Sequence, residues 1–551
     1  MEAVVPADIV IKTTALFTAE ELEPHAGCVA VRGNEIVAVG APDKVQPFVG
    51  PDTEVIDAGN KLVMPGFNDS HMHFALGSIQ KDEDFCCDLM FLPSEQACVD
   101  AVAKFAAEHP DNPWIYGQGW YSPAWEDPTD PDCRSLDALD IDRPIVLSDF
   151  SMHVVWCNTA ALKAVGIDRN TPTPEGGLIR HFDNGEPNGF LSEPQATNIL
   201  LDVVLNKPDL DASLLKSMRK FNRLGITSIG DMHPLGVTTP GVYDIYDRLA
   251  NEDLSTLRIS YYSALDAPMA ESQALRARHH GERVRMAGLK YILDGCPEAY
   301  TAYMHEPYLN APMGKGFRGE PACNQEALDR MVLEADKNGF DVRIHAIGDA
   351  SATMIIDAVE RAEEACGDKG TRFAIEHTDN LQFEDIARMK RLGINAAIQP
   401  QHPIGGLGQG VYEGSLGEER MSHMWRYREE ADGGIHLGLG TDWPAVMSID
   451  PIDTVYAAVT RSEFDGHPAE GYFRENALTL GETLQAHTLG SAYVEGFERR
   501  LGSLAAGKLA DIVILSGNPF EMDPMTLREL EVETTIFDGR IVYRKDEAEL
   551  G

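Results

Sequence analysis

The stretch "KLVMPGFNDSHMHF" (residues 61–74) ends a short apolar run with two histidines, His71 and His73. Side chains at positions i and i+2 of a β-strand point to the same face, so the two imidazoles are expected to aim at one point. Imidazole nitrogens bind metals and move protons. Two structural histidines would give the same pattern, so the pair needs support from elsewhere in the chain.

Support comes from other apolar runs that end in a side chain with metal-binding chemistry. These side chains are His345 in "DVRIHAIGD", His377 in "RFAIEHTD" and Asp442 in "IHLGLGTDW". Imidazole and carboxylate ligands without thiolates are typical of catalytic rather than structural metal sites, and they suit Zn²⁺, Mn²⁺, Fe²⁺ or Ni²⁺.

Lys290 is a further candidate, because it stands between Leu289 and Tyr291 in the apolar run "GLKYILDG". Burial of a lysine disfavours its ammonium form, and a neutral amine can add CO₂ to form a carbamate whose two oxygens bridge two metals. The structural alternative is an ion pair between Lys290 and an acid such as Asp294.

Eight apolar runs alternate with helix-length segments such as 325–339 and 351–365, which is the pattern of parallel strands joined by helices. The runs cover 62–74, 225–233, 257–265, 288–295, 341–349, 372–379, 394–402 and 435–443. The sequence therefore predicts an α/β protein with a (β/α)₈ TIM barrel. Active sites of this fold lie at the carboxyl ends of the strands, where the candidate side chains stand.

Both ends of the chain read as short strands with turn signals at Gly33-Asn34 and Asp538-Gly539. We expect residues 1–63 and 491–551 to form the two parts of a small β-sandwich, and residues 64–490 to form the barrel. The gap after the first barrel strand is too long for one connection, which predicts an inserted subdomain at about 78–212. The insert holds a predicted helix at 95–109 and the aromatic side chains Trp114, Tyr116, Trp120 and Trp125.

Composition excludes several functions. The 551 residues carry a formal charge of −42 with 43% hydrophobic residues, so the surface of this globular chain would repel nucleic acid and anionic membranes. The start "MEAVVPADIV" has neither a basic region nor a long apolar run, and nine scattered cysteines fit reduced thiols. We expect a cytoplasmic homodimer that binds neither nucleic acid nor membrane.

Several motifs together resemble one enzyme family. They are "MPGFNDSHMHF", "DGCPEAYTAYM", "RIHAIGDAS", "FAIEHTD", "GLGTDWPA" and "GSLAAGKLADIVIL". They resemble the amidohydrolase superfamily in its YtcJ-like branch (amidohydrolase family 3), which includes N-substituted formamide deformylase. The resemblance covers nearly the whole chain, including the split β-sandwich and the insert.

The resemblance implies a hydrolase with one or two divalent metals per chain, Zn²⁺ being favoured and Mn²⁺, Fe²⁺ or Ni²⁺ the alternatives. It implies that the metal ligands are His71, His73, a carbamylated Lys290, His345, His377 and Asp442. The family segment "SDFSMHVVWCNTAAL" implies a substrate-facing histidine at His153, for which a core histidine beside Trp156 is the alternative. His402, at the end of "IQPQH", is a similar catalytic candidate.

The predicted reaction is hydrolysis of an amide-type C–N bond in a small-molecule N-acyl, N-formyl or cyclic amide. Metal-activated water attacks, and Asp442 is the general acid and base. The insert would act as a lid, and its aromatic side chains indicate an apolar or ring-bearing substrate unless they form the insert's own core. The alternative is a mononuclear deaminase of a cyclic amidine or aminoazine. A non-catalytic scaffold is disfavoured because every ligand position is filled.

Overall fold

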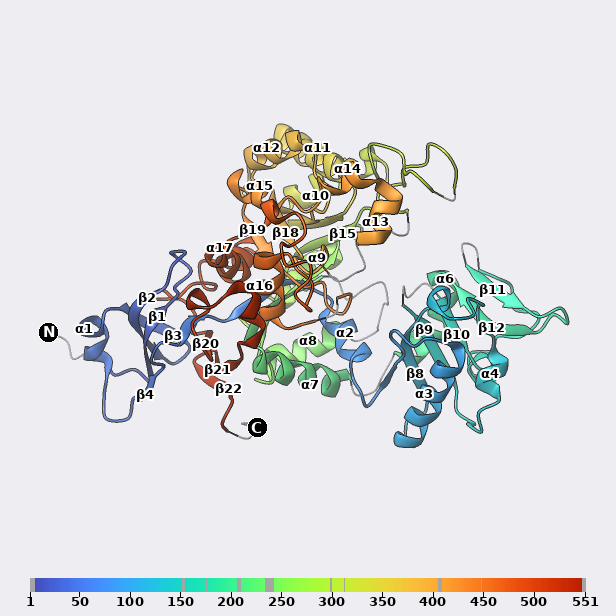
Figure 1. Ribbon diagram of the computed structural model, residues 1–551, viewed down its shortest axis with the longest axis horizontal. Helices are drawn as coiled ribbons and strands as arrows, with labels where there is room; N and C mark the ends of the chain where they lie inside the picture. Colours follow the sequence, from blue (N-terminus) through green and yellow to red (C-terminus); the bar gives the residue numbers. More distant parts are fainter. Residues whose placement is uncertain are drawn as a thin grey trace. The chain divides into compact units, whose positions relative to one another are not determined.

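A computed structural model describes the chain from residue 5 to residue 547 with short gaps. The described residues are 5–150, 154–174, 177–205, 210–232, 242–297, 300–311, 313–404, 409–446 and 448–547. They divide into two compact units, of which one holds an eight-stranded parallel sheet and a sheet built from both ends of the chain. The other unit holds a six-stranded sheet (Figure 1).

The parallel sheet has its eight strands in chain order, each paired with the next. The strands are β6 (Phe67–Met72), β13 (Ile226–Asp231), β14 (Arg258–Ala264), β15 (Val284–Ile292), β16 (Asp341–Ala346), β17 (Phe373–His377), β18 (Asn395–Ile398) and β19 (Leu437–Leu439). Each strand overlaps one of the eight predicted runs, so the barrel prediction is confirmed.

The first and last strands meet through hydrogen bonds at their carboxyl ends. Ser70 Oγ donates to the carbonyl of Leu439 at 3.0 Å. Beyond β19, the amide of Asp442 donates to the carbonyl of His71 at 2.7 Å, and the amide of His73 donates to the carbonyl of Trp443 at 2.8 Å. These bonds bring the two ends of the sheet together as a barrel requires, and they fix the loop that carries Asp442 beside the His71–His73 pair.

Amphipathic helices connect the strands, as the α/β pattern requires. They include α10 (Gln325–Lys337), α11 (Asp349–Cys366), α12 (Phe383–Leu392) and α15 (Tyr427–Asp432). The largely buried α16 (Pro451–Thr460) follows the last barrel strand. Asn324 caps α10 by accepting from the amide of Ala327 at 3.0 Å, and Asp450 caps α16 by accepting from the amide of Ile452 at 2.9 Å. The predicted helices at 325–339 and 351–365 correspond to α10 and α11.

Strands from both ends of the chain form one mixed sheet in the same unit as the barrel, seen in Figure 1 as blue and red strands side by side. Its strands are β1 (Ile9–Leu16), β2 (His25–Arg32), β3 (Glu35–Gly40), β4 (Glu54–Asp57), β5 (Leu62–Pro65), β20 (Ile512–Leu515), β21 (Val532–Phe537) and β22 (Arg540–Arg544). The turns predicted at Gly33-Asn34 and Asp538-Gly539 join β2 to β3 and β21 to β22. We call this sheet the terminal sheet.

One prediction about the first barrel strand is wrong in detail. The run 62–74 is not one strand, because Leu62–Pro65 forms β5 of the terminal sheet, paired with β1 and β20, and the barrel strand β6 begins only at Phe67. Gly66 lies between them. A Cβ at Gly66 would stand 2.1 Å from Thr227 Oγ1, so only glycine lets the chain pass this close to β13. The chain thus passes from one sheet to the other through a single residue.

The second unit contains the inserted segment and its own sheet, ordered β11-β12-β10-β9-β8-β7. Its strands are β7 (Cys86–Asp88), β8 (Ile115–Trp120), β9 (Ile145–Asp149), β10 (Val154–Cys157), β11 (Leu178–His181) and β12 (Pro187–Ser192), with α3 (Glu95–Glu108) beside them. Helix α3 matches the predicted helix at 95–109. Trp120 and Trp125 belong to the core of this unit together with Trp156. The alternative reading of these aromatic side chains, a core of the insert itself, therefore holds for Trp120 and Trp125.

Candidate metal centre

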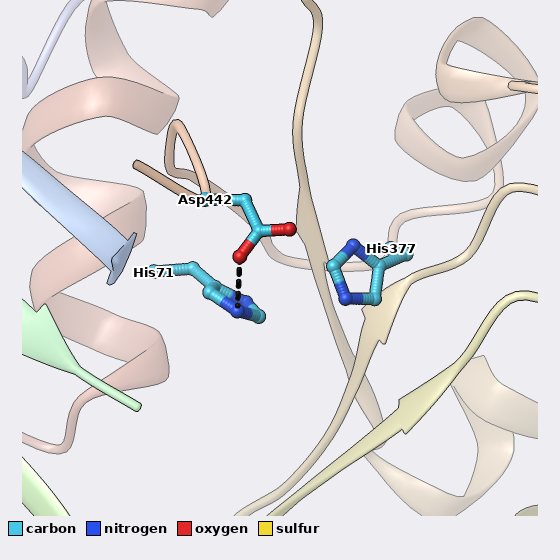
Figure 2. Close-up of side chains that lie close together, drawn as sticks. All are labelled: His71, His377 and Asp442. Atoms are coloured by element: carbon cyan, nitrogen blue, oxygen red, sulfur yellow. Dashed lines mark ion pairs between the residues drawn. The ribbon is translucent and has the colours of Figure 1, made fainter. Parts of the chain in front are cut away.

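His71, His377 and Asp442 converge at the carboxyl ends of β6, β17 and β19. Each of the three offers a potential ligand atom, and these atoms all lie within 4.8 Å of one another (Figure 2). Nε2 of His71 is 3.2 Å from Oδ1 of Asp442. Figure 2 shows His377 on the far side of the carboxylate from β6, with its ring turned toward the same space. Two imidazoles and one carboxylate thus face one point, from β6, from β17 and from the loop that follows β19.

Asp442 has two further histidine neighbours. Nε2 of His73 lies 3.2 Å from the same oxygen, Oδ1, that faces His71. Nε2 of His402 lies 3.7 Å from the other oxygen, Oδ2. The His402 ring is stacked on His377 at 5.4 Å with an interplanar angle of 15°. The structure therefore brings His402, which the sequence placed at the end of the seventh strand, to the same carboxylate as the histidine pair.

His345 joins the cluster from β16. Its ring is 4.3 Å from the His377 ring, in an edge-to-face arrangement. Its Nε2 is 3.6 Å from Oδ1 of Asp294, which follows β15. Asp294 in turn accepts hydrogen bonds from the amides of Ile347 and Gly348 at 3.0 and 2.9 Å. Asp294 thereby holds the turn that follows His345, and it is not the ion-pair partner of Lys290 that the structural alternative proposed.

The backbone leaves the extended conformation where it delivers these side chains. His377 has φ of +78° and Asp442 has φ of +66°, both in the left-handed region that is unfavourable for these residues. Next to Asp442, a Cβ at Gly440 would stand 2.6 Å from the amide nitrogen of His71. The turn after β19 therefore approaches β6 at a distance that only glycine allows.

Burial sets the charge of this cluster. Burial lowers the pKa of His345 to about 3 and the pKa of His377 well below its ordinary value, so both rings are neutral. Burial opposes ionisation of Asp442, but the neighbouring histidines, His71 above all, outweigh it and hold the pKa of this carboxyl well below its usual range. Neutral imidazole and ionised carboxylate are the forms that bind a metal.

Lys290, on β15, is 3% exposed. In the part of the chain that the structure describes, no hydrogen-bond partner reaches its Nζ. Burial lowers the pKa of this amine to about 8, against the attraction of Glu376 and Asp442. A buried lysine without a partner is costly, which makes Lys290 a candidate for a functional role.

Sequence reasoning missed two buried charged residues that lie next to the cluster, Glu376 and Arg343. Nδ1 of His71 donates to Oε2 of Glu376, and the Arg343 guanidinium donates to both oxygens of Glu376. All three side chains are at most 1% exposed. A signal for Arg343 was present, because it precedes His345 by two residues in an apolar strand and so shares its face. Glu376 directly precedes His377 and gave no such signal.

Asp69 is a third missed residue, two positions before His71 on β6. It accepts hydrogen bonds from the Thr441 amide at 3.0 Å and the Thr441 hydroxyl at 2.7 Å. Burial raises the pKa of Asp69 to about 7, and the hydrogen bonds from Thr441 oppose this rise. Because Thr441 precedes Asp442, Asp69 ties the Asp442 loop to the strand that carries His71.

His153 lies outside the described residues, so its predicted role stays a prediction. Tyr116, another aromatic side chain of the insert, is fully buried in the insert's unit, 5.7 Å from the Phe85 ring. Like Trp120 and Trp125, it packs inside its own unit. Trp114 is half-buried.

Comparisons with known proteins agree with the barrel fold and with the cluster of potential metal ligands. The family described as "Amidohydrolase family" matches residues 54–543. The protein YtcJ of Bacillus subtilis (strain 168) is 30% identical over 539 residues, which cover 96% of this chain and 98% of that protein. N-substituted formamide deformylase of Arthrobacter pascens is 26% identical over 555 residues, which cover 98% of each chain.

A solved structure has the same fold. It belongs to an uncharacterized metal-dependent hydrolase of Pyrococcus horikoshii OT3, and it matches with a TM-score of 0.75 at 23% identity, covering 94% of this chain and 98% of that one. At this identity the likeness concerns the fold.

Proposed function

Since the chain belongs to the amidohydrolase family, as its motifs predicted, we propose that it is a metal-dependent hydrolase that cleaves an amide-type C–N bond. The candidate substrates are small N-acyl, N-formyl and cyclic amides. The likeness to N-substituted formamide deformylase favours an N-formyl amide among the three. The observation that carries the proposal is the convergence of histidines on Asp442 at the carboxyl end of the barrel.

The residues of this cluster fit a divalent metal. Within the described residues, the buried Nδ1 atoms of His73 and His377 have no hydrogen-bond partner. Burying such nitrogens without a partner costs free energy, which a metal ligand bond would offset. The donor set of imidazole and carboxylate favours Zn²⁺, with Mn²⁺, Fe²⁺ or Ni²⁺ as alternatives.

We assign the metal ligands by the chemistry that the cluster offers. The proposed ligands are His71, His73, Lys290, His345, His377 and Asp442. When bound, the metal would polarise a carbonyl group and lower the pKa of a water molecule to about 7. The compact group of His71, His377 and Asp442 supports at least one metal.

Lys290 supports a second metal if it is carbamylated. Its amine is buried and, among the residues described, unpartnered. Reaction with CO₂ would form an N–C bond and release one proton, which converts the amine into an anionic carbamate. The carbamate brings negative charge and two oxygens to a site whose other proposed ligands are four neutral imidazoles and one carboxylate, and it would offset the charge of two cations.

In the reaction, Asp442 moves the proton. It accepts a proton from the attacking water, whose oxygen forms a bond to the substrate carbonyl carbon. It then donates this proton to the nitrogen as the C–N bond breaks, giving a carboxylic acid and an amine. The position of the carboxylate supports this role, because Oδ1 faces His71 and His73 while Oδ2 faces His402, at the centre of the proposed ligands. His402 and His153 are the candidates for binding the carbonyl oxygen.

The remaining features of the organisation are proposals as well. We propose that residues 1–63 and 491–551 form a small β-sandwich domain around a barrel of residues 64–490, and that the insert at about 78–212 acts as a lid. We also propose a homodimer in the cytoplasm. No helix among the described residues is both long and apolar enough to cross a membrane.

The test is turnover of a panel of N-formyl, N-acyl and cyclic amides by metal-free protein and by protein reloaded with Zn²⁺ or Mn²⁺. We expect release of amine and carboxylic acid only after reloading. Absence of turnover of every amide, with metal bound, would contradict the proposal.

The second candidate is a mononuclear deaminase of a cyclic amidine or aminoazine. The observation that favours it is the single compact group of three potential ligands, which suits one metal. Ammonia release from cyclic amidines with one metal per chain would identify this activity, whereas two metals per chain and amide turnover would exclude it.

A further inference from the structure

Glu376 occupies the position from which the orientation of His71 can be controlled. It is the penultimate residue of β17, and its carboxylate accepts a hydrogen bond from Nδ1 of His71. In a neutral ring whose Nδ1 donates, the other ring nitrogen, Nε2, carries the lone pair that can bind a metal, and Nε2 is the atom that lies 3.2 Å from Asp442. The Glu376 contact therefore selects the ring nitrogen that faces the proposed metal.

Arg343 fixes Glu376 in turn. Its Nε donates to one carboxylate oxygen of Glu376, and its Nη2 donates to the other at 3.1 Å. Its Nη1 donates to the carbonyl of Ser70 at 2.8 Å. Since Ser70 directly precedes His71, one guanidinium holds both the carboxylate that orients the ring and the backbone from which the ring extends.

Burial of the Arg343–Glu376 ion pair costs desolvation free energy, so stability alone does not explain it. Glu376 is 0% exposed and Arg343 is 1% exposed. Buried ion pairs often contribute little to stability compared with apolar side chains of the same volume. A pair whose carboxylate also binds a histidine of the site is the arrangement that orients metal ligands in other proteins.

We propose that Glu376 and Arg343 are positioning residues that set the ring nitrogen and the orientation of His71, and thereby the affinity of the site for its metal. The proposal rests on the proposed function, because it takes His71 to be a metal ligand. It assigns to Glu376 and Arg343 no contact with substrate. Their proposed effect acts on a ligand, His71, and not on the substrate.

The experiment measures the dissociation constant of Zn²⁺ by competition with a chromophoric chelator, and the visible absorption of the Co²⁺-loaded protein. Glu376→Gln keeps the size of the side chain but removes its charge and one acceptor oxygen. We expect its Zn²⁺ dissociation constant to rise about 10- to 100-fold, with an altered Co²⁺ spectrum. Arg343→Lys keeps the charge but loses the bidentate hydrogen bond to Glu376, so we expect a smaller rise of the Zn²⁺ dissociation constant.

A matched control comes from the second buried arginine–carboxylate pair of the same unit. Asp511 accepts two hydrogen bonds from Arg258, at 2.7 and 2.9 Å, and contacts no histidine of the site in the described part of the chain. Asp511→Asn should lower the melting temperature and leave the Zn²⁺ dissociation constant of the folded protein unchanged. A general loss of stability would affect both carboxylate variants, whereas positioning of His71 affects only Glu376→Gln.

The possible outcomes separate this proposal from the proposed function. Wild-type protein that binds no divalent metal would contradict the proposed function. Wild-type protein that binds Zn²⁺ tightly, with Glu376→Gln within twofold of it, would overturn the positioning role alone. If Glu376→Gln does not fold, Arg343→Lys decides, and an unchanged dissociation constant and Co²⁺ spectrum in that variant overturn the proposal.

Discussion

Arg258, the first residue of the barrel strand β14, forms a buried ion pair with Asp511, which directly precedes β20 of the terminal sheet. Its Nη2 also donates to Asp538 at 2.8 Å, in the turn between β21 and β22. Arg258 is 1% exposed and Asp511 3%. One guanidinium therefore joins the barrel to two strands of the terminal sheet.

Replacing Arg258 by methionine should destabilise the protein strongly. The substitution leaves the buried Asp511 carboxylate without its arginine and Asp538 with Arg283 alone, which costs about 3–5 kcal/mol of the free energy of unfolding. Thermal unfolding measured by circular dichroism checks this. The control is Arg330→Ala, which removes an exposed pair with Glu326 and should leave the melting temperature unchanged. Equal melting temperatures for Arg258→Met and wild type would contradict the role of this pair.

Asp442→Asn should reduce turnover by roughly 10²- to 10⁴-fold, because the amide cannot accept the proton from water. The side chains are nearly equal in size, so the circular dichroism spectrum should not change. The measurement is kcat on the best amide of the panel. Asp450→Asn, in the same loop, is a matched control that retains the cap of α16 and should keep wild-type turnover. Near-normal turnover of Asp442→Asn would refute the assignment.

Lys290→Ala should lose one of the two proposed metals per chain and most of the activity, because the carbamate that would help to hold them could not form. Metal analysis of dialysed protein measures the loss, and short carboxylic acids should partly restore it. Bicarbonate should speed reloading of the metal-free wild type. Lys390→Ala, which removes a lysine that donates to the Gly434 carbonyl at 2.7 Å, is the control and should keep full metal content.

A wild-type crystal structure would also decide this point. One metal per chain at saturation, together with an unmodified Lys290 amine in clear density, would refute the carbamate and favour the mononuclear deaminase.

Because the imidazole of His487 is buried, we expect the protein to lose stability in mild acid. Its buried Nδ1 donates to the carbonyl of Asn68 at 3.1 Å, and burial lowers its pKa to about 4. A histidine in the unfolded chain has a pKa of about 6.5, so below that pH the unfolded chain binds a proton that the native protein excludes. Stability is therefore lost as the pH falls from about 6.5 toward 4. Between about pH 7.5 and pH 5, His487 should cost roughly 2 kcal/mol.

The free energies of unfolding of wild type and His487→Gln are measured at both pH values, and the difference between the two proteins is compared. The stability of wild type relative to the variant should fall by that amount on acidification, in urea unfolding followed by fluorescence. Thr488→Val, a neighbouring buried substitution without a titrating group, should show the same offset from wild type at both pH values. A difference for His487→Gln that does not vary with pH would show that His487 is not held neutral.

The barrel could be predicted because its signals are local. Each strand is a short apolar run, and the turns at Gly33-Asn34 and Asp538-Gly539 follow from residues that tolerate a positive φ. The sequence placed the start of the barrel at residue 64, but the need for glycine at Gly66 could not be predicted, because it depends on the approach of Thr227, which is 161 positions away, as 227 − 66 gives. Sequence periodicity alone could not show that β5 and β6 belong to different sheets.

The histidine cluster was predictable where it follows the period of a strand, as in His71 and His73. Its supporting residues were not. The hydrogen bond between His71 and Glu376 joins residues 305 positions apart and exists only because the barrel brings β6 near β17. Glu376 and His377 are neighbours, which in an extended strand would face opposite sides. The positive φ of His377 lets both reach His71, and no sequence pattern announced it.

The passage of β5 into β6 constrains the order of events during synthesis on the ribosome. β5 pairs on one edge with β1, which is already made, and on the other with β20, which is translated more than 400 residues later, since 512 − 65 is 447. The partners of Arg258 also come from this late segment. The strand that carries His71 and leads to His73 is therefore fully anchored only when the last strands have left the ribosome. A nascent chain interrupted after the barrel would hold every proposed ligand residue and still lack the sheet that anchors the first two.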